Sequence, residues 1–252
     1  MNPVHGILII IVAGLILLSP QVVPGATLFE AEETARLIAA LLDSGRKVID
    51  QNQGLINDRR KGHKGFTPEV FERQLVEEFR TRTGVDLTRL SAARLPPVAG
   101  ELLRALVSAG KAVVADAQAV INQRGVGYKN FIPATFGSQA AERFSAASHV
   151  HLKQTTLQPR NPKNAPDPYE EAVLRRLITQ PGQSVTISNV TDEGKTLRVL
   201  TPIYYTRDCL MCHGAPAGEL DVSGFPKEGA TDGDLAGAIS VMIPLDDARR
   251  ER

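Results

Sequence analysis

Two cysteines and a histidine stand close together near the C-terminal end of the sequence, in the order Cys209, Cys212, His213. Cys-x-x-Cys-His is the spacing at which c-type cytochromes attach haem. Two thiols three positions apart can reach the two vinyl groups on one edge of a porphyrin, and the imidazole that follows then lies under the iron. The motif therefore predicts one covalently attached haem c, with His213 as the proximal iron ligand.

Three other readings of a Cys-x-x-Cys pair are a zinc site, a thioredoxin-like dithiol and a plain disulfide. The chain has 2 cysteines and 5 histidines, so a zinc site would need two further ligands from the histidines. A thioredoxin-like centre needs a helix after the dithiol, and residues 214–218 are Gly-Ala-Pro-Ala-Gly. A disulfide does not need the adjacent histidine. Covalent haem is the reading that uses all three residues.

The sixth ligand of the iron would decide between a closed site and an open one. A thiolate is excluded because both cysteines are used for attachment. His149 and His151 lie on one predicted strand, and Met242 lies on a face of another strand with small neighbours, so these three are the candidate distal ligands. An open or water-filled position remains the alternative, and it would allow a gas to bind.

The N-terminus predicts export. Residues 7–18 are all apolar or small, which is too short for a confident membrane span, and Ser19, Pro20 and Pro24 end the run. Residues 23–26 contain small side chains suited to cleavage. Residues 1–25 are therefore a signal peptide or, because no Lys or Arg precedes the run, an uncleaved anchor. Both readings predict a periplasmic protein, the second one attached to the inner membrane.

Charge and composition narrow the range of partners. Lys and Arg number 29 against 28 Asp and Glu, which gives no electrostatic reason to expect nucleic acid or an acidic membrane surface as a partner. Membrane contact is expected only through an uncleaved N-terminal segment. Tryptophan is absent, so a buried porphyrin would supply much of the planar apolar bulk of the core. The sequence leaves the oligomeric state open.

An internal repeat occupies the first half of the chain. Residues 40–79 align with 105–144 at a constant offset of 65, with 16 of 40 positions identical. Each copy predicts a long helix, a glycine-containing turn and a second helix that opens at Pro68 or Pro133. Leu95-Pro96-Pro97 marks the boundary between the copies. We therefore expect a helical repeat copy over 27–95 and a haem domain over 98–247.

The second half changes to strand-like patterns. Alternating polarity predicts a strand over 149–153, and apolar runs predict strands over 184–190, 197–205 and 235–244. A helix is expected over 169–179, with Asp167 as its N-cap and Pro168 at its first position. This order predicts the α+β class, with helical hairpins packed on a small antiparallel sheet.

Five segments together carry a family resemblance. They are Gly-Tyr-Lys-Asn-Phe-Ile-Pro-Ala at 127–134, Lys-Gln-Thr at 153–155, Arg-Asn-Pro-Lys-Asn-Ala-Pro-Asp at 160–167, the haem motif through Gly214, and Gly-Asp-Leu-Ala-Gly-Ala-Ile-Ser-Val at 233–241. This combination resembles a family of exported c-type haem proteins that was long known as a domain of unknown function. The resemblance covers about residues 98–247, and the first repeat copy departs from it.

The resemblance implies a PAS-like fold and a sensing role. Members of that family occur alone or as sensor domains of bacterial histidine kinases and chemoreceptors, and they are implicated in redox or gas sensing. Cys209, Cys212 and His213 match the family's haem motif residue for residue. Arg160 and Asn164 are candidate ligands of a haem propionate, with a structural turn as the alternative.

Two functional classes follow from a single haem c. As a redox or gas sensor, the protein would act through a separate partner, because the sequence contains no kinase or methyl-accepting region. As a periplasmic electron-transfer cytochrome, it would need only an exposed haem edge and an unidentified redox partner. Enzymatic activity is less favoured, because no distal His and Arg pair is evident.

Overall fold

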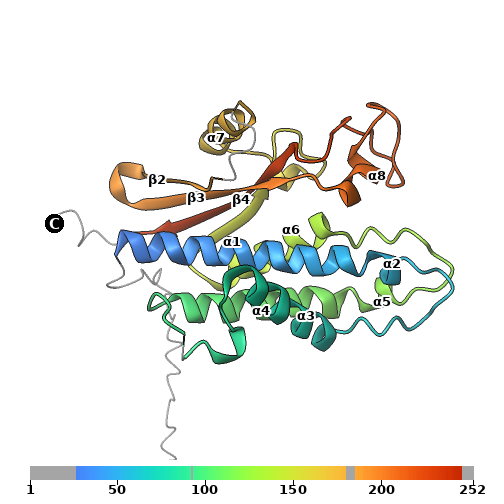
Figure 1. Cartoon of the computed structure of the whole chain (residues 1–252), viewed down its shortest axis with the longest axis horizontal. Coiled ribbons are helices and arrows are strands. Elements are labelled where there is room, and N and C mark those ends of the chain that lie inside the picture. Colours follow the sequence, from blue (N-terminus) through green and yellow to red (C-terminus); the bar gives the residue numbers. More distant parts are fainter. Residues whose placement is uncertain (1–26, 92, 180–184, 246–252) are drawn as a thin grey trace, which may run out of the picture.

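The computed structural model describes residues 27–245, except for residue 92 and residues 180–184. The predicted signal peptide or anchor over 1–25 lies outside the described residues. Among the described helices, none combines the length and the apolarity that crossing a membrane requires. The described part contains helices and one antiparallel sheet, which confirms the predicted α+β class (Figure 1).

The helices follow the internal repeat closely. The first copy forms α1 (Leu28–Gln51), α2 (Gln53–Ile56) and α3 (Pro68–Thr83), and a short 3₁₀ turn η1 (Leu87–Arg89) follows. The second copy forms α4 (Ala99–Asp116), α5 (Gln118–Ile121) and α6 (Pro133–Ala147). The offset of 65 converts the bounds of α2 into those of α5. Pro68 and Pro133 open α3 and α6, as predicted, because proline suits the first turn of a helix.

The two copies pack against each other within one chain and exchange equivalent hydrogen bonds. The Gln53 side-chain amide donates to the backbone oxygen of Phe131 at 2.8 Å, and the Gln118 amide donates to that of Phe66 at 3.0 Å. Gln53 and Gln118 occupy the same place in the repeat, and so do Phe66 and Phe131. The repeat therefore builds a pseudo-symmetric four-helix arrangement from α1, α3, α4 and α6.

Shared glycines let the helices approach closely at the centre of this arrangement. The rings of Phe71 and Phe136 lie 5.1 Å apart between the two copies. A Cβ atom at Gly45 would lie 2.7 Å from Cε1 of Phe136, and one at Gly110 would lie 3.2 Å from Cε1 of Phe71. Both phenylalanines are buried. The glycines therefore recur because an aromatic ring from the other copy fills the space of their side chain.

Gly45→Ala is expected to lower the free energy of unfolding by about 1–2 kcal/mol. Overpacking a core costs about 1–3 kcal/mol, and the better helix propensity of alanine offsets up to about 1 kcal/mol of that cost. The control is Gly54→Ala in α2, where no atom lies within 4 Å of the added Cβ, and it should be neutral or stabilising. Urea unfolding of the two variants tests this difference. Equal stability of the two would contradict it.

Four strands form the sheet in the order β1-β4-β3-β2, with every neighbouring pair antiparallel. Their bounds are β1 (His151–Thr155), β2 (Ile187–Thr191), β3 (Thr196–Tyr204) and β4 (Leu235–Pro244). The prediction for β4 is confirmed in full. β2 begins later than expected, and residue 184 of the predicted strand lies outside the described residues.

The sheet is covered on both faces. Helix α1 packs on β3 and β4, and α7 (Pro168–Ile178) covers the opposite face with Val173, Leu174 and Leu177 (Figure 1). Asp167 caps α7 in a capping box with Glu170, as the sequence predicts. This layering places α1, the first helix of the first copy, directly against the two strands that precede and follow the Cys-x-x-Cys-His motif.

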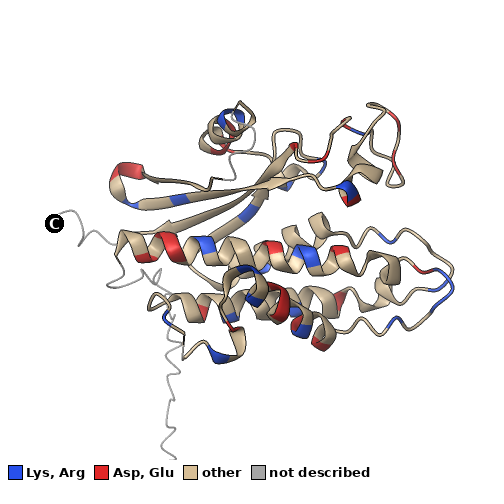
Figure 2. Cartoon of the chain, viewed as in Figure 1, with Lys and Arg blue, Asp and Glu red and all other residues tan. Residues whose placement is uncertain are grey.

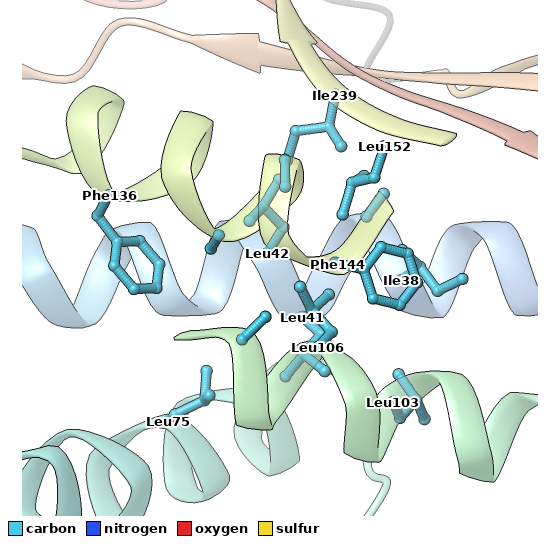
Figure 3. Close-up of a cluster of buried hydrophobic side chains, with 14 of the residues drawn as sticks. Ile38, Leu41, Leu42, Leu75, Leu103, Leu106, Phe136, Phe144, Leu152 and Ile239 are labelled. Carbon is cyan, nitrogen blue, oxygen red and sulfur yellow. The ribbon is translucent and has the colours of Figure 1, made fainter. Parts of the chain in front are cut away.

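One large core joins both repeat copies to the sheet. Figure 3 shows side chains from α1, α3, α4 and α6 meeting those of β1 and β4, namely Ile38, Leu41, Leu42, Leu75, Leu103, Leu106, Phe136, Phe144, Leu152 and Ile239. The boundary at 95–97 thus separates two copies in the sequence, and the copies share one core in space. The first copy is an integral part of this core.

Charged side chains of both signs are mixed over the helices (Figure 2). Several pairs connect different helices, such as Lys111 with Glu72 at 2.5 Å and Arg82 with Asp43 at 2.5 Å. The loop after α2 is the most basic segment in view, with Arg59, Arg60 and Lys61 in sequence. The mixed pattern agrees with the balanced composition.

Candidate functional site

The cysteine motif lies on a long connection between the two central strands. β3 ends at Tyr204, and the chain returns to the sheet at Leu235. Two backbone hydrogen bonds close the base of this connection, from Tyr205 to Asp234 and from Gly233 to Tyr205, both 2.9 Å long. The motif lies at the same end of the molecule as α2 and α5 (Figure 1). The sheet therefore holds the site rigidly at one of its ends.

A 3₁₀ turn η4 (Arg207–Cys209) and a single helical turn α8 (Leu210–His213) carry the three motif residues. The backbone N–H of Thr206 donates to Sγ of Cys209 at 3.4 Å, and Gly214 N–H donates to the Leu210 oxygen at 2.8 Å. Residues three apart on a helical turn share one side, so both thiols can face one ligand. Both cysteines are free and partly exposed. Within the described residues, no group of three or more His, Cys, Asp or Glu is arranged to hold a metal ion.

His213 is oriented by a carboxylate that the sequence analysis missed. Its Nδ1 lies 2.7 Å from Oε2 of Glu228. An ionised carboxylate only accepts hydrogen bonds, so Nδ1 carries a hydrogen, and in the neutral imidazole the lone pair is then on Nε2. The Tyr205 ring lies 4.9 Å from the imidazole and is tilted by 35°. Nε2 is therefore the nitrogen of His213 that is left available to a ligand.

The environment of Tyr205 keeps its hydroxyl protonated. Burial and the nearby charge of Glu228 raise the pKa of Tyr205 to about 12. The hydroxyl oxygen lies 3.5 Å from Nδ1 of His213, which is a long contact compared with the 2.7 Å bond to Glu228. The Tyr205 ring therefore packs against the imidazole of His213, and the hydrogen-bond partner of that imidazole is Glu228.

Arg160 connects the proline-rich segment to the motif. Its Nε donates to Glu228 at 2.9 Å, Nη1 donates to Asp221 at 2.6 Å, and Nη2 donates to the Cys212 oxygen at 2.9 Å. The Arg160 side chain is 22% exposed, and the Asp221 side chain is fully buried. Of the two predicted propionate ligands, the structure brings Arg160 to the motif, where it already pairs with two carboxylates.

Asn164 makes hydrogen bonds with α6 and with the residue after β1. Its side-chain oxygen accepts a 3.1 Å hydrogen bond from the Ser138 hydroxyl of α6, and its backbone oxygen accepts one from Thr156 at 3.3 Å. These contacts fasten the short 3₁₀ turn η2 (Pro162–Asn164) between α6 and β1. These contacts support the structural alternative for Asn164, and its role as a propionate ligand stays a prediction.

Asp221 organises the loop after the motif. Its Oδ1 accepts from the Ser223 hydroxyl at 2.6 Å and from the backbone N–H groups of Ser223 and Phe225 at 2.7 and 3.1 Å. Burial alone would raise the pKa of Asp221, but these hydrogen bonds and the Arg160 guanidinium hold it well below its usual range. The carboxylate is thus ionised. Burial of the Cys212 thiol, together with the charge of Asp221, raises the pKa of that thiol.

Large apolar side chains are exposed on the motif, on the loop that follows it and on the loop that carries Tyr128. Met211 is 73% exposed, and the loop that follows adds Leu220, Val222 and Phe225, with Val126 on the loop between α5 and α6. Tyr128 of that second loop is close enough for Cys212 and Asp221 to influence its pKa, which burial raises. These groups fit a haem. The two thiols could bond to its vinyl groups, the imidazole nitrogen could bind its iron, and the exposed apolar side chains could cover its faces.

The predicted distal ligands do not share this site. His151 pairs with Met242 across β1 and β4, and Met242 pairs with Arg198 near the start of β3. Arg198 precedes Tyr204 by six residues, which is about 20 Å along a strand. His149 precedes β1 and is partly buried, which lowers its pKa. These three residues therefore lie towards the opposite end of the sheet from the motif, because the strand register separates them from it.

The fold and the site define an α+β protein with a Cys-x-x-Cys-His turn at the end of a four-stranded antiparallel sheet. A sequence model of the Tll0287-like family matches residues 25–244, and the chain belongs to this family. The match confirms the family resemblance, and it corrects the expectation that the first repeat copy departs from the family, because it includes that copy.

One solved structure is also similar, the "cyanobacterial heme-protein Tll0287". It shares 22% sequence identity over 60% of this chain and 97% of its own, with a TM-score of 0.40. The search of curated proteins returned no match.

Proposed function

We propose that this protein binds one haem c covalently through Cys209 and Cys212, with His213 as the proximal iron ligand. The observation that carries the proposal is the geometry of the helical turn and of its histidine. Glu228, from the loop that follows, binds Nδ1 of His213 and leaves Nε2 available. The exposed apolar side chains of Met211 and of the loop that follows support the proposal further. The protein after which the family is named is described as a heme-protein, in agreement with this proposal.

The haem would serve a redox or gas sensor that acts through a separate partner protein. The motif directly continues β3, and β3 and β4 pack on α1. A change of redox or ligand state can therefore shift the strands against the helical arrangement, where a partner protein would recognise the shift. In this proposal the sheet between α1 and α7 has the role of the sheet in a PAS-like sensor domain.

The alternative is a periplasmic electron-transfer cytochrome. The exposure of Met211, between the two cysteines, and of Leu220, on the loop that follows, favours it, because an accessible cofactor edge would allow electron exchange with a partner. In either role the protein is exported, since haem c attachment is completed outside the cytoplasm. Residues 1–25 would direct export, and they would also anchor the protein to the inner membrane if they are not removed.

An absorption spectrum of the exported, full-length protein tests these proposals. It is recorded for the ferric and the dithionite-reduced protein, with and without carbon monoxide, and acid-acetone extraction follows. We expect the haem to resist extraction, since two thioether bonds hold it. Haem that is fully extracted, or protein without haem, would contradict covalent attachment.

The same spectra separate gas sensing from redox sensing and electron transfer. Sharp low-spin reduced bands that carbon monoxide does not change would indicate a six-coordinate iron, and would favour electron transfer or redox sensing. A high-spin spectrum that carbon monoxide shifts would indicate an open site, and would favour gas sensing.

A further inference from the structure

The hydrogen bond between His213 and Glu228 has a chemical consequence for the haem proposed above, on which this inference rests. We propose that Glu228 is a positioning residue that fixes the His213 imidazole through Nδ1 and lowers the reduction potential of the haem. A carboxylate is a stronger acceptor than the neutral groups that could serve in its place. It therefore increases the electron density that the imidazole can donate through Nε2.

Glu228 is itself held on both oxygens. Oε2 accepts from His213 at 2.7 Å and from Nη2 of Arg160 at 3.0 Å, and Oε1 accepts from Nε of Arg160 at 2.9 Å. The Glu228 side chain is 22% exposed, and that of His213 is 29% exposed. Two-point binding by a guanidinium fixes a carboxylate in direction as well as in distance. Glu228 is therefore preorganised as an acceptor for the imidazole.

The charges around the imidazole give the direction of the effect. Both Glu228 oxygens accept hydrogen bonds from the Arg160 guanidinium, and such two-point pairing favours a charged carboxylate. A nearby negative charge and a more strongly donating imidazole both favour ferric over ferrous iron. The potential should therefore be lower than with a neutral acceptor.

The test is a redox titration of the haem-loaded protein with Glu228→Gln. Glutamine keeps the shape of the side chain and a carbonyl acceptor, but it removes the charge. At a fixed ambient potential we expect at least a tenfold rise in the ratio of ferrous to ferric protein. This corresponds to a positive shift of about 59 mV for a one-electron couple.

Glu219→Gln is the matched control. Glu219 lies on the same loop and pairs with Lys227 at 3.3 Å, and it has no described contact with His213 or Arg160. It removes the same charge without touching the imidazole. The reduction potential of the haem in Glu219→Gln should stay near that of the wild type if the hydrogen bond to His213, and not the net charge of the loop, sets the potential.

The outcomes separate this inference from the function on which it rests. Haem that resists extraction together with an unchanged potential in Glu228→Gln would overturn the role of Glu228 alone. Wild-type protein without covalent haem would overturn both. If Glu228→Gln does not retain haem, Glu228→Asp is titrated instead, since it keeps the charge and withdraws the carboxylate by one methylene. A positive shift supports the inference, and an unchanged potential overturns it.

Discussion

Cys212→Ser is expected to yield protein without stable covalent haem. Serine cannot form a thioether bond, so attachment through both vinyl groups is lost and Cys209 is the one thiol left to hold the haem. More haem should then be lost on acid-acetone extraction than from wild-type protein, which should retain it. Haem-stained gels and the pyridine haemochrome spectrum of the exported protein measure how much haem the variant and the wild type retain.

Met211→Leu is the control for this substitution. Met211 lies between the two cysteines and is 73% exposed, so it shares the local backbone without attaching the cofactor. It should retain haem at the wild-type level. Purified Cys212→Ser protein that keeps haem attached through both vinyl groups would refute the assignment of the motif.

The donor residues of the site could be predicted from the sequence because they are local. Cys209, Cys212 and His213 lie within five positions, and one helical turn suffices to bring them together. Glu228 could not be predicted in the same way. Its bond to Arg160 joins residues 68 positions apart, and it forms only because the loop after the motif folds back on the proline-rich segment. A single acidic residue in a glycine-rich loop gives no periodic signal.

The distal candidates show a second limit of sequence reasoning. Alternation correctly predicts that Leu152 is buried, but it does not predict which end of the sheet faces the motif. Antiparallel register decides this, and it pairs His151 with Met242 far from Tyr204. The repeat is a similar case. The sequence shows two copies of one helical pattern, but it does not show that their apolar faces pack together in one core, which the structure shows.

The Arg160 network should contribute strongly to stability. Arg160→Met keeps much of the apolar length of the side chain and removes its hydrogen bonds to Asp221, Glu228 and the Cys212 oxygen. Removing one partner of a buried ion pair typically costs about 3–5 kcal/mol, because the other charge stays buried without compensation. Urea unfolding at pH 7 should show a loss of this size.

Arg175→Met is the control, since Arg175 pairs with Glu171 on the surface of α7 and is 68% exposed. Exposed pairs contribute about 0–1 kcal/mol, so its effect should be small. Equal losses in the two variants would contradict the importance of the buried network.

The stability that Arg160 contributes should also depend on pH. Hydrogen bonds from Ser223, Arg160 and the loop backbone outweigh burial and hold the pKa of folded Asp221 well below its ordinary value of about 4. A group with a lowered folded pKa stabilises the protein above its unfolded pKa and loses this contribution as the pH falls through its folded pKa. The difference in stability between wild type and Arg160→Met should therefore be largest near neutral pH and become smaller below about pH 4. A difference that stays constant down to pH 2.5 would show that Asp221 is not the charge that Arg160 compensates.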